Sequence, residues 1–394
     1  MKPRIAFIGD LPVAGVLPEE CLRASHRGSK HPAPWVAALL PALARLSDFQ
    51  LRVMLVHRAI VKPTVVEVNG VEYEAVPTQW LERWNRPTGY WTKSLATRAA
   101  LRRFRPHLVH AFGFETGAAT IALRSGFPVS CFIQGIAEFL FKVSTHMPVY
   151  HRRIARAAEA RAITQVRWLV AETEFARRWA LAKNPQAQVT LIPHPLREVF
   201  LEQPAPAYGQ RLITVGSLIF TKGMDTVLRA FAQTRRPGAR LAVVGDGALR
   251  GDLTRLATEL GLASRVVFLG SLGAEGVIQQ MLQCSACVLG SRMDTSPNVL
   301  TEAHALGLPV IGTRTGGIPE MIEDGRDGFV VGVEDIAGMA ARMDELLGSA
   351  ELATRLGAAG REKVSRLNAA EAVATAHRGF FGRILAQVSP HGAV

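Results

Sequence analysis

The chain has 394 residues, 48% of them hydrophobic, and only four cysteines. This length exceeds what one hydrophobic core usually supports, so we expect two domains, and four cysteines are too few for a disulfide-stapled secreted scaffold. No uncharged apolar stretch reaches the ~18 residues of a membrane span, and the apolar run after Arg4 is too short for a signal peptide, so we expect a cytoplasmic protein.

The charge is unevenly distributed along the chain. Of the 46 Lys and Arg and the 33 Asp and Glu, 27 basic and 14 acidic residues lie in positions 1–200, and the remainder balances at 19 each. The whole net charge of +13 therefore belongs to the first half, which predicts an anionic partner for that half. Nucleic acid is disfavoured because no recognition module is apparent.

The first half alternates short apolar runs with segments of helical periodicity. Strands are expected at 5–9, 50–56, 107–112, 128–133 and 167–172, with helices at 35–46, 92–104 and 151–163. This order predicts βαβ units and a mainly parallel sheet. The run 189–196 closes the domain, and 197–210, with two prolines, has the composition of a linker.

The second half repeats this order more clearly. Strands are expected at 211–216, 240–245, 265–270, 287–291, 309–313 and 328–332, separated by helical segments and followed by helices at 335–348 and near 376–387. The predicted fold is α/β, with two Rossmann-like, doubly wound domains. We place them at 1–196 and 211–375, joined by the linker 197–210, with a C-terminal helix and tail at 376–394. Ligands of such sheets bind at the carboxyl ends of the strands, so the expected active site is the cleft between the domains.

Two short motifs carry little functional weight. The segment 245–251 begins Gly-Asp-Gly, but its third glycine comes one residue late for a dinucleotide fingerprint. Cys284 and Cys287 form a C-x-x-C within an apolar run and have no second pair or histidine cluster nearby, which favours a buried pair over a redox or metal site.

The segment 291–320 concentrates residues suited to a phosphorylated sugar. Asp294 follows a buried strand, and Ser296 as N-cap with Pro297 at the first position predicts a helix start. The first amides of that helix, at Asn298 and Val299, then form an anion site that suits a diphosphate.

Two further features of this segment point to the same ligand. Glu302, near the second turn of the predicted helix, can accept hydrogen bonds from two adjacent sugar hydroxyls. Gly316 and Gly317 follow the next strand and permit close approach of the backbone to a ligand. Two acids eight residues apart are also common on solvated helices, so these residues alone do not assign a function.

The segment resembles the signature of the family 4 retaining glycosyltransferases, which is an acid, seven residues, then Glu, followed by E-A-x-x-x-G-x-P-V and G-G-x-P-E. The matching residues are Glu302-Ala303, Gly307, Pro309-Val310 and Gly316-Gly317-Ile318-Pro319-Glu320. The resemblance covers the second half well and the first half loosely. It implies a GT-B fold whose C-terminal helix returns to the first domain, with Glu302 on the ribose of the nucleotide and Asp294 on the donor sugar. The family usually has Glu where this chain has Asp294, so the sugar must sit closer or a water must bridge.

A second cluster, 215–223, resembles the family's G-R-L followed by K-G. Gly216 matches, and Lys222 matches the lysine that binds the diphosphate, where its charge would serve in place of a metal. Ser217 occupies the family's Arg position, which removes one fixed cation; Arg292 or Arg314 could compensate. No D-x-D occurs, and no metal site is expected. A third match, Gly270-Ser271, would lie near the base, although a tight turn explains it equally well.

The resemblance assigns the acceptor to the first domain. Gly15, in the loop after the first strand, and Gln134, where the family often has His, are the candidate acceptor residues. Gln134 can bind a hydroxyl but cannot titrate near neutral pH. His110 is expected in the core.

The basic excess of the first half lies in two stretches, 97–107 and 151–168. The first follows an aromatic segment that holds Trp80 and Trp84, a combination that suits an anionic membrane surface, although inward-packed tryptophans beside a solvated basic face would look the same.

The predicted activity is metal-independent transfer of a sugar, with retention, from a UDP- or GDP-type nucleotide sugar to a glycan or lipid-linked acceptor, at the cytoplasmic face of the membrane and without a cofactor. The resemblance implies that no protein nucleophile is needed and that attack comes from the front face, with the departing phosphate as base. Positioning and charge stabilisation then fall to the protein. One alternative is a catalytically silent relative that binds a ligand or partner, which Asp294, Ser217 and Gln134 favour. Another is a GT-B sugar-nucleotide epimerase.

Overall fold

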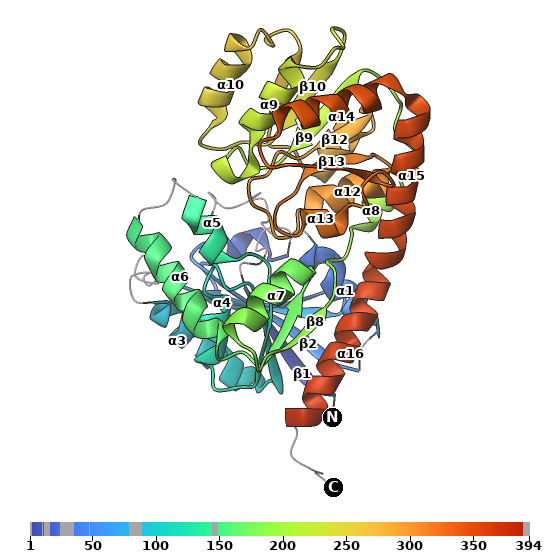
Figure 1. Cartoon of the computed structure of the whole chain (residues 1–394). Helices are drawn as coiled ribbons and strands as arrows, with labels where there is room; N and C mark the ends of the chain where they lie inside the picture. The colour runs from blue at the N-terminus through green and yellow to red at the C-terminus, as the bar shows by residue number, and fades with distance from the viewer. Residues whose placement is uncertain are drawn as a thin grey trace. The chain divides into compact units, whose positions relative to one another are not determined.

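The structure is a computed structural model that describes residues 2–9, 11, 16–23, 35–46, 48–78, 89–143 and 149–388. The structure divides into two compact units (Figure 1). The first combines Met1–Lys142 and Met147–Pro195 with the C-terminal segment Ala370–Val394, and the second is built on Leu196–Ala369. Gly15, Trp80 and Trp84 lie outside the described residues.

The first unit is built on an eight-stranded sheet of order β3-β4-β2-β1-β5-β6-β7-β8. Every neighbouring pair is parallel except β3 and β4. The strands are β1 (Arg4–Gly9), β2 (Gln50–His57), β3 (Thr64–Val68), β4 (Val71–Pro77), β5 (Leu108–Phe112), β6 (Val129–Phe132), β7 (Trp168–Ala171) and β8 (Gln188–Leu191). The parallel α/β fold expected for this half is confirmed.

The antiparallel hairpin of β3 and β4 is the main element of this unit that we did not predict. Asn69 and Gly70 join its strands, both with positive φ, at 52° and 76°. An Asn-Gly pair between alternating apolar residues is the usual sign of a two-residue hairpin turn. The hairpin could therefore have been found from the sequence.

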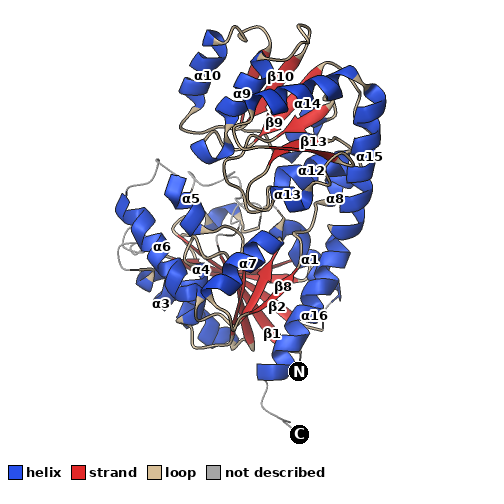
Figure 2. Cartoon of the chain, viewed as in Figure 1, coloured by secondary structure: helices blue, strands red, loops and turns tan. Residues whose placement is uncertain are grey.

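Helices cover both faces of the first sheet (Figure 2). They are η1 (Glu19–Cys21), α1 (Val36–Leu46), α3 (Trp91–Phe104), α4 (Ala118–Leu123), α5 (Ala137–Val143), α6 (Val149–Ile163) and α7 (Glu174–Lys183), with α16 (Ala370–Val388) from the end of the chain. The two faces enclose separate apolar clusters, and α16 completes one of them against α1. The expected return of the C-terminal helix to the first domain is confirmed.

An aromatic cluster fixes α16 on the first sheet. The ring of Phe381 lies 6.0 Å from Phe7 on β1 and 5.1 Å from His110 on β5. His377, one turn earlier on α16, lies 6.3 Å from His110. Both histidines are 0% exposed, and burial holds the pKa of each below its ordinary value. The two imidazoles are therefore neutral core residues, as expected for His110.

The second unit is built on a six-stranded parallel sheet of order β11-β10-β9-β12-β13-β14. Its strands are β9 (Arg211–Val215), β10 (Arg240–Val244), β11 (Val266–Gly270), β12 (Ala286–Val288), β13 (Val310–Thr313) and β14 (Gly328–Val331). Its helices are α8 (Glu198–Leu201), η3 (Phe220–Lys222), α9 (Met224–Ala232), α10 (Arg250–Glu259), α11 (Ala274–Met281), α12 (Asn298–Leu306), α13 (Ile318–Met321), α14 (Ile336–Gly348) and α15 (Ala350–Leu367). Both domains are thus Rossmann-like, as predicted.

Residues 197–210, expected to form a linker, contain α8 and pack on the second unit. Phe200 is fully buried in the apolar cluster that includes Leu300 and Leu306 of α12. The hydroxyl of Tyr208 donates to the carbonyl of Leu347 at 2.6 Å. The two prolines do not make this segment a free connection, because Phe200 is buried and the Tyr208 hydroxyl is hydrogen-bonded to the second unit.

Candidate functional site

The topological switch point of the second sheet lies between β9 and β12. From β9 the chain proceeds outward to β10 and β11, and then returns to the other side for β12, β13 and β14. The loops that leave β9 and β12 therefore diverge from neighbouring strand ends, which is where open parallel sheets bind their ligands. Lys222 lies in the first of these loops and Asp294 in the second.

The two loops meet through an ion pair. Nζ of Lys222 donates to Oδ2 of Asp294 at 2.5 Å, and their side chains are 29% and 12% exposed. Gly223, after Lys222, packs against the backbone before Asp294 so closely that a Cβ atom would lie 1.9 Å from the carbonyl oxygen of Gly290. Glycine is therefore required at this crossing, and its φ of +58° also favours glycine.

The helix that follows Asp294 begins one residue later than predicted. Pro297, with φ −73° and ψ 115°, is the N-cap of α12, and Asn298 and Val299 are its first two helical residues. The prediction of Ser296 as the N-cap was wrong: no side chain caps the helix, and Oγ of Ser296 instead contacts Sδ of Met321 at 3.6 Å. The extended ψ of Pro297 keeps it outside the helix, so the first free amides belong to Asn298 and Val299 as expected.

Glu302 on α12 has a partner that the sequence did not reveal. Nη2 of Arg197 donates to Oε1 of Glu302 at 2.7 Å, with the two side chains 26% and 14% exposed. The guanidinium of Arg197 also lies 4.8 Å from the ring centre of the buried Phe200. The two charges are 105 residues apart, which is why no local pattern could pair them.

The glycine pair after β13 lies against the Asp294 loop. The amide of Gly317 donates to the carbonyl of Asp294 at 3.1 Å. Gly316 has φ +56°, and a Cβ atom there would lie 1.7 Å from the same carbonyl oxygen. These contacts bring Gly316, Gly317, Asp294 and Lys222 to one edge of the sheet.

The β9 end of the site contains Gly216 and Ser217. Gly216 lies beside Lys222, because a Cβ atom added at Gly216 would be 3.9 Å from the Lys222 side chain. Gly245 packs on the backbone of Gly216, because a Cβ atom added at Gly245 would be only 1.9 Å from the Gly216 carbonyl oxygen. Ser217 is exposed. Gly270 is the last residue of β11, and Ser271 follows it at the outer end of the same edge. The amide of Gly245 donates to the carbonyl of Gly270 at 2.8 Å.

Arg292, one of the two arginines considered as compensation for Ser217, is already paired with two carboxylates in this structure. Its guanidinium makes a two-pronged ion pair with Asp225, at 2.9 and 2.7 Å, and its Nε donates to Glu334 at 2.6 Å. Hydrogen bonding to Asp225 raises the pKa of Arg292. For Asp225, burial opposes ionisation, but the bonds from Arg292 outweigh it and lower its pKa. Arg314 is exposed in the β13 loop.

The carboxyl edge of the first sheet holds Gln134 and an acid that sequence reasoning missed. Gln134 is half-buried in the loop after β6. Glu115, in the loop after β5, has its carboxylate within 3.3 Å of where a Cβ of Gly135 would lie. Burial raises the pKa of Glu115 to about 7, and does the same for Glu159, which is 2% exposed and accepts from the amides of Ala137 and Glu138.

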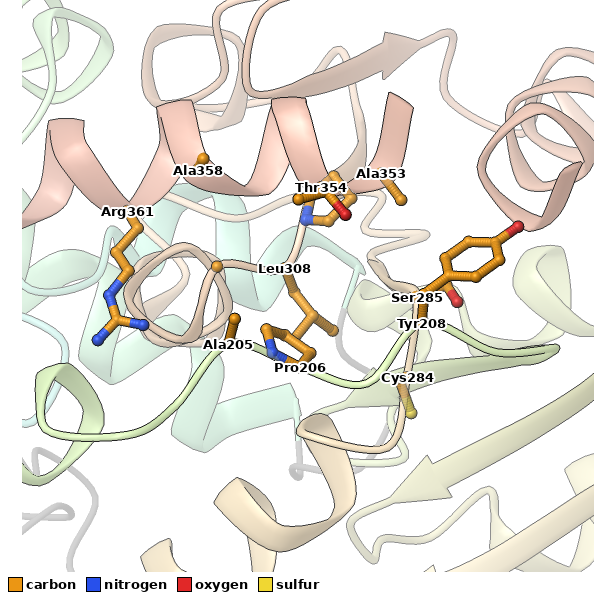
Figure 3. Close-up of a pocket in the computed structure, with 12 residues that line it drawn as sticks. Ala205, Pro206, Tyr208, Cys284, Ser285, Leu308, Ala353, Thr354, Ala358 and Arg361 are labelled. Atoms are coloured by element: carbon orange, nitrogen blue, oxygen red, sulfur yellow. The ribbon is translucent and has the colours of Figure 1, made fainter. Parts of the chain in front are cut away.

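The cavity in Figure 3 belongs to the opposite edge of the second sheet. It has a volume of about 130 Å³ and is lined by segments that precede strands, including Cys284, Ser285 and Leu308, and by Ala353 and Arg361 of α15. Cys284 and Cys287 are buried free thiols, as expected from their apolar surroundings, and burial raises the pKa of Cys284 to about 12. This cavity contains none of the predicted site residues.

Within the described ranges, no helix combines the length and apolarity needed to cross a bilayer. In the same residues, no three His, Cys, Asp or Glu side chains are grouped so that they could hold a metal ion.

Both halves of the chain match glycosyltransferase domain families. Residues 202–363 match the family of glycosyl transferases group 1, and residues 29–195 match the glycosyl transferase 4-like domain. A lipopolysaccharide core biosynthesis glycosyltransferase of Rhizobium meliloti is 31% identical over 172 residues, which is 44% of this chain and 49% of that protein. A GDP-mannose-dependent alpha-(1-6)-phosphatidylinositol monomannoside mannosyltransferase of Mycolicibacterium smegmatis is 33% identical over 159 residues, 38% of this chain and 42% of that protein. The chain thus matches about half the length of these curated relatives.

Solved structures share the fold over nearly the whole chain. A sucrose-phosphate synthase from Thermosynechococcus elongatus superposes with a TM-score of 0.80 at 21% identity, covering 98% of this chain and 100% of that one. HepE of Anabaena, solved in complex with UDP and glucose, gives a TM-score of 0.70 at 16% identity, covering 97% of this chain and 100% of that one.

Proposed function

Because the chain belongs to the group 1 glycosyltransferases, as its two matching domains show, we propose that it transfers a sugar from a nucleoside-diphosphate sugar to a hydroxyl of a glycan or lipid-linked acceptor. The observation that carries this proposal is the Lys222–Asp294 pair at the switch point of the second sheet. A lysine there can neutralise the diphosphate, and a carboxylate beside it can bind hydroxyls of the sugar.

The donor would lie along the carboxyl edge of the second sheet. Its diphosphate would face Lys222 and the first amides of α12, and its ribose would face Glu302. Gly316 and Gly317 would let the backbone approach the sugar and phosphate. A UDP or GDP donor is supported by two relatives, since HepE is solved with UDP and the Mycolicibacterium enzyme is GDP-mannose-dependent.

We propose that the reaction retains the anomeric configuration and needs no metal. Lys222 would take the place of a metal by neutralising the leaving diphosphate, whose oxygen would remove the proton of the attacking hydroxyl on the same face. NMR of the product tests retention, because an inverted anomer would contradict it. Full activity in EDTA tests metal independence.

The acceptor would bind at the carboxyl edge of the first sheet, near Gln134 and Glu115. Amide and carboxyl groups of this kind hydrogen-bond hydroxyls. The described part of the chain supports a polar acceptor here, because Oε2 of Glu115 is buried without a protein hydrogen-bond partner. Replacement of Gln134 or Glu115 should therefore raise KM for the acceptor and leave donor hydrolysis unchanged.

The first unit offers a surface suited to anionic lipid headgroups. Trp91 and Leu95 on α3 are 55% and 60% exposed, and Val149 and Tyr150 on α6 are 55% exposed each. The exposed arginines of the same helices are Arg98, Arg102, Arg103, Arg153, Arg156 and Arg161. Both helices contact α4 (Figure 1), and a cavity of about 310 Å³ is lined by Gly89, next to α3, and by α6.

This surface supports a peripheral association with the membrane at its cytoplasmic face, where the buried free cysteines would stay reduced. Apolar side chains among arginines bind an anionic interface through both burial and charge. Liposome flotation at low salt tests it: the protein should float with anionic vesicles and not with neutral ones. Failure to float with either would remove the membrane from the proposal.

The donor is tested first by thermal shift with UDP, GDP, ADP and their sugars, which needs no acceptor. Transfer or slow hydrolysis of a stabilising nucleotide sugar would support the proposal. Binding without turnover would favour a catalytically silent relative, and an epimerised donor would favour an epimerase. If none of these nucleotides or nucleotide sugars binds, the proposed donor site is wrong.

A further inference from the structure

Arg292 joins four segments at the carboxyl edge of the second sheet. It lies two residues before Asp294, and its side chain is only 12% exposed. Its guanidinium bonds Asp225 at the start of α9 with both prongs and Glu334 after β14 with Nε. Its Nη1 also donates to the carbonyl of Phe220 at 3.0 Å, and its Cζ lies 4.3 Å from the centre of that ring.

The backbone of Arg292 adds two more connections. Its amide donates to the carbonyl of Thr221 at 2.8 Å, and its carbonyl accepts from Oγ1 of Thr315 at 3.1 Å. Thr221 precedes Lys222, and Thr315 precedes Gly316. Side chain and backbone together therefore fix the lysine turn and the glycine loop relative to the strand end that carries Asp294.

The geometry separates the role of Arg292 from that of Lys222. A planar guanidinium that already binds two carboxylates and a carbonyl is held in place by its hydrogen bonds. Glu334, one of the two carboxylates, has a φ of 60°, a backbone conformation that residues other than glycine rarely adopt. The ion pair between Arg292 and Glu334 therefore forms although the backbone of Glu334 is in an unfavourable conformation, which indicates that the surrounding loop keeps Glu334 in place.

We propose that Arg292 is a positioning residue, which sets Lys222 opposite Asp294 without touching the donor. This proposal rests on the proposed function, since it assigns to Lys222 the diphosphate of a nucleotide sugar. The rival role is a direct one, in which Arg292 leaves Asp225 when the donor binds and supplies the cation that Ser217 lacks. Charge alone would suffice for the direct role, whereas the positioning role needs the fork of the guanidinium and its partner Asp225.

The test compares Arg292→Lys, Arg292→Ala and Asp225→Asn by calorimetric binding of UDP and GDP and by donor hydrolysis. All three variants should lose about tenfold or more in affinity for the nucleoside diphosphate, the size of one misplaced charged hydrogen bond. Hydrolysis should fall in kcat by up to about a hundredfold, as misplacement by about 1 Å can cause. The double variant Arg292→Lys/Asp225→Asn should lose no more nucleotide affinity than either single variant, because both substitutions break the same ion pair.

Arg265→Lys is the matched control for general loss of stability. Arg265 belongs to the same unit, and its guanidinium carbon lies 4.5 Å from the ring centre of Phe231. Its side chain donates to the carbonyls of Ala239 and Arg236, which precede β10 and so lie away from the carboxyl edge of the sheet. Its replacement should lower the melting temperature without changing nucleotide affinity or kcat.

The outcomes separate this proposal from the one it rests on. If Arg292→Lys and Asp225→Asn keep wild-type nucleotide affinity while Arg292→Ala loses affinity, Arg292 acts directly and the positioning role is overturned. The positioning role is also overturned if all three variants keep wild-type affinity. If the wild type binds UDP or GDP but turns over no donor, the proposed activity fails, and the binding data still decide the role of Arg292. Absence of any nucleotide binding by the wild type would overturn both.

Discussion

Lys222 and Asp294 are 72 positions apart in the chain, yet their charged groups lie 2.5 Å apart across the switch point of the second sheet. The two side chains are partly exposed. Gly216 precedes Lys222 in the loop after β9, and Gly316 and Gly317, from the loop after β13, pack against the backbone of Asp294. A donor that enters this edge would therefore meet a lysine already held by a carboxylate.

Replacement of Lys222 by Ala should reduce sugar transfer by about a hundredfold or more, because loss of one charge-stabilising donor typically costs that much. The measurement is turnover of the stabilising nucleotide sugar. Arg229, an exposed cation on α9, provides the control, and Arg229→Ala should leave turnover unchanged. Unchanged activity of the Lys222 variant would remove Lys222 from the mechanism.

Asp294→Asn should lower turnover more than Asp294→Glu. The amide keeps the length but loses the charge that holds Lys222, whereas Glu keeps the charge and is the residue that the family usually has. Both variants should be compared at saturating donor. Equal activity of wild type and Asp294→Asn would show that the charge at this position is dispensable.

The Arg197–Glu302 pair should contribute measurably to the stability of the second unit. In a double-mutant cycle with Arg197→Ala and Glu302→Gln, we expect a coupling of about 1 kcal/mol in the free energy of unfolding, because the pair is only partly exposed. The exposed Arg342–Glu345 pair, with side chains 40% and 43% exposed, should give about 0.3 kcal/mol. A coupling near zero for the first pair would mean that Arg197 does not hold Glu302.

Acid should weaken the first unit through His110 and His377. Burial lowers the pKa of His377 to about 4, below its ordinary 6.5, so the unfolded chain takes up this proton first. The stabilising effect of the neutral ring is complete above pH 6.5 and is lost as the pH falls towards 4; at pH 5 the loss for His377 alone is about 2 kcal/mol.

His377→Phe should reduce this acid sensitivity, measured as the free energy of unfolding in urea at pH 7 and pH 5. His151→Gln, at a partly exposed position on α6, is the control and should leave the difference unchanged. An unchanged pH dependence in His377→Phe would show that the buried ring is not its source.

Glu115 should act in the opposite direction. Burial raises its pKa to about 7, so the folded state keeps the proton that the unfolded chain releases near pH 4.5. Its stabilising effect is therefore present below pH 4.5 and is lost as the pH rises through 7. Glu115→Gln should remove part of this loss, which urea unfolding at pH 5.5 and pH 7.5 would detect as a smaller decline.

The sequence predicts the sheets of this protein better than its contacts. The parallel strands follow from continuous apolar runs, and the C-terminal helix from its periodicity. The β3–β4 hairpin was missed although Asn69-Gly70 signals it, whereas the start of α12 was misplaced because Ser-Pro fits two N-cap registers equally well.

The pairing of charged residues could not be predicted in the same way. Lys222, Asp294 and Glu302 are visible because their spacing matches a family pattern. Arg197 and Arg292 belong to no such pattern, since their partners are brought to them only by the order of the strands. The raised pKa of Glu115 is likewise a result of burial by loops far apart in the sequence.

The helix α16 has a consequence for how the protein is made. Nearly all of the second unit comes from the continuous stretch Leu196–Ala369, so its main part is translated without interruption. Most of the first unit precedes this stretch, but Phe381 and His377 of α16 are translated only after it and then join the aromatic cluster of the first unit. A nascent chain halted before Ala370 would lack the side chains that pack on Phe7 and His110, so the first unit is completed only after the second has been translated.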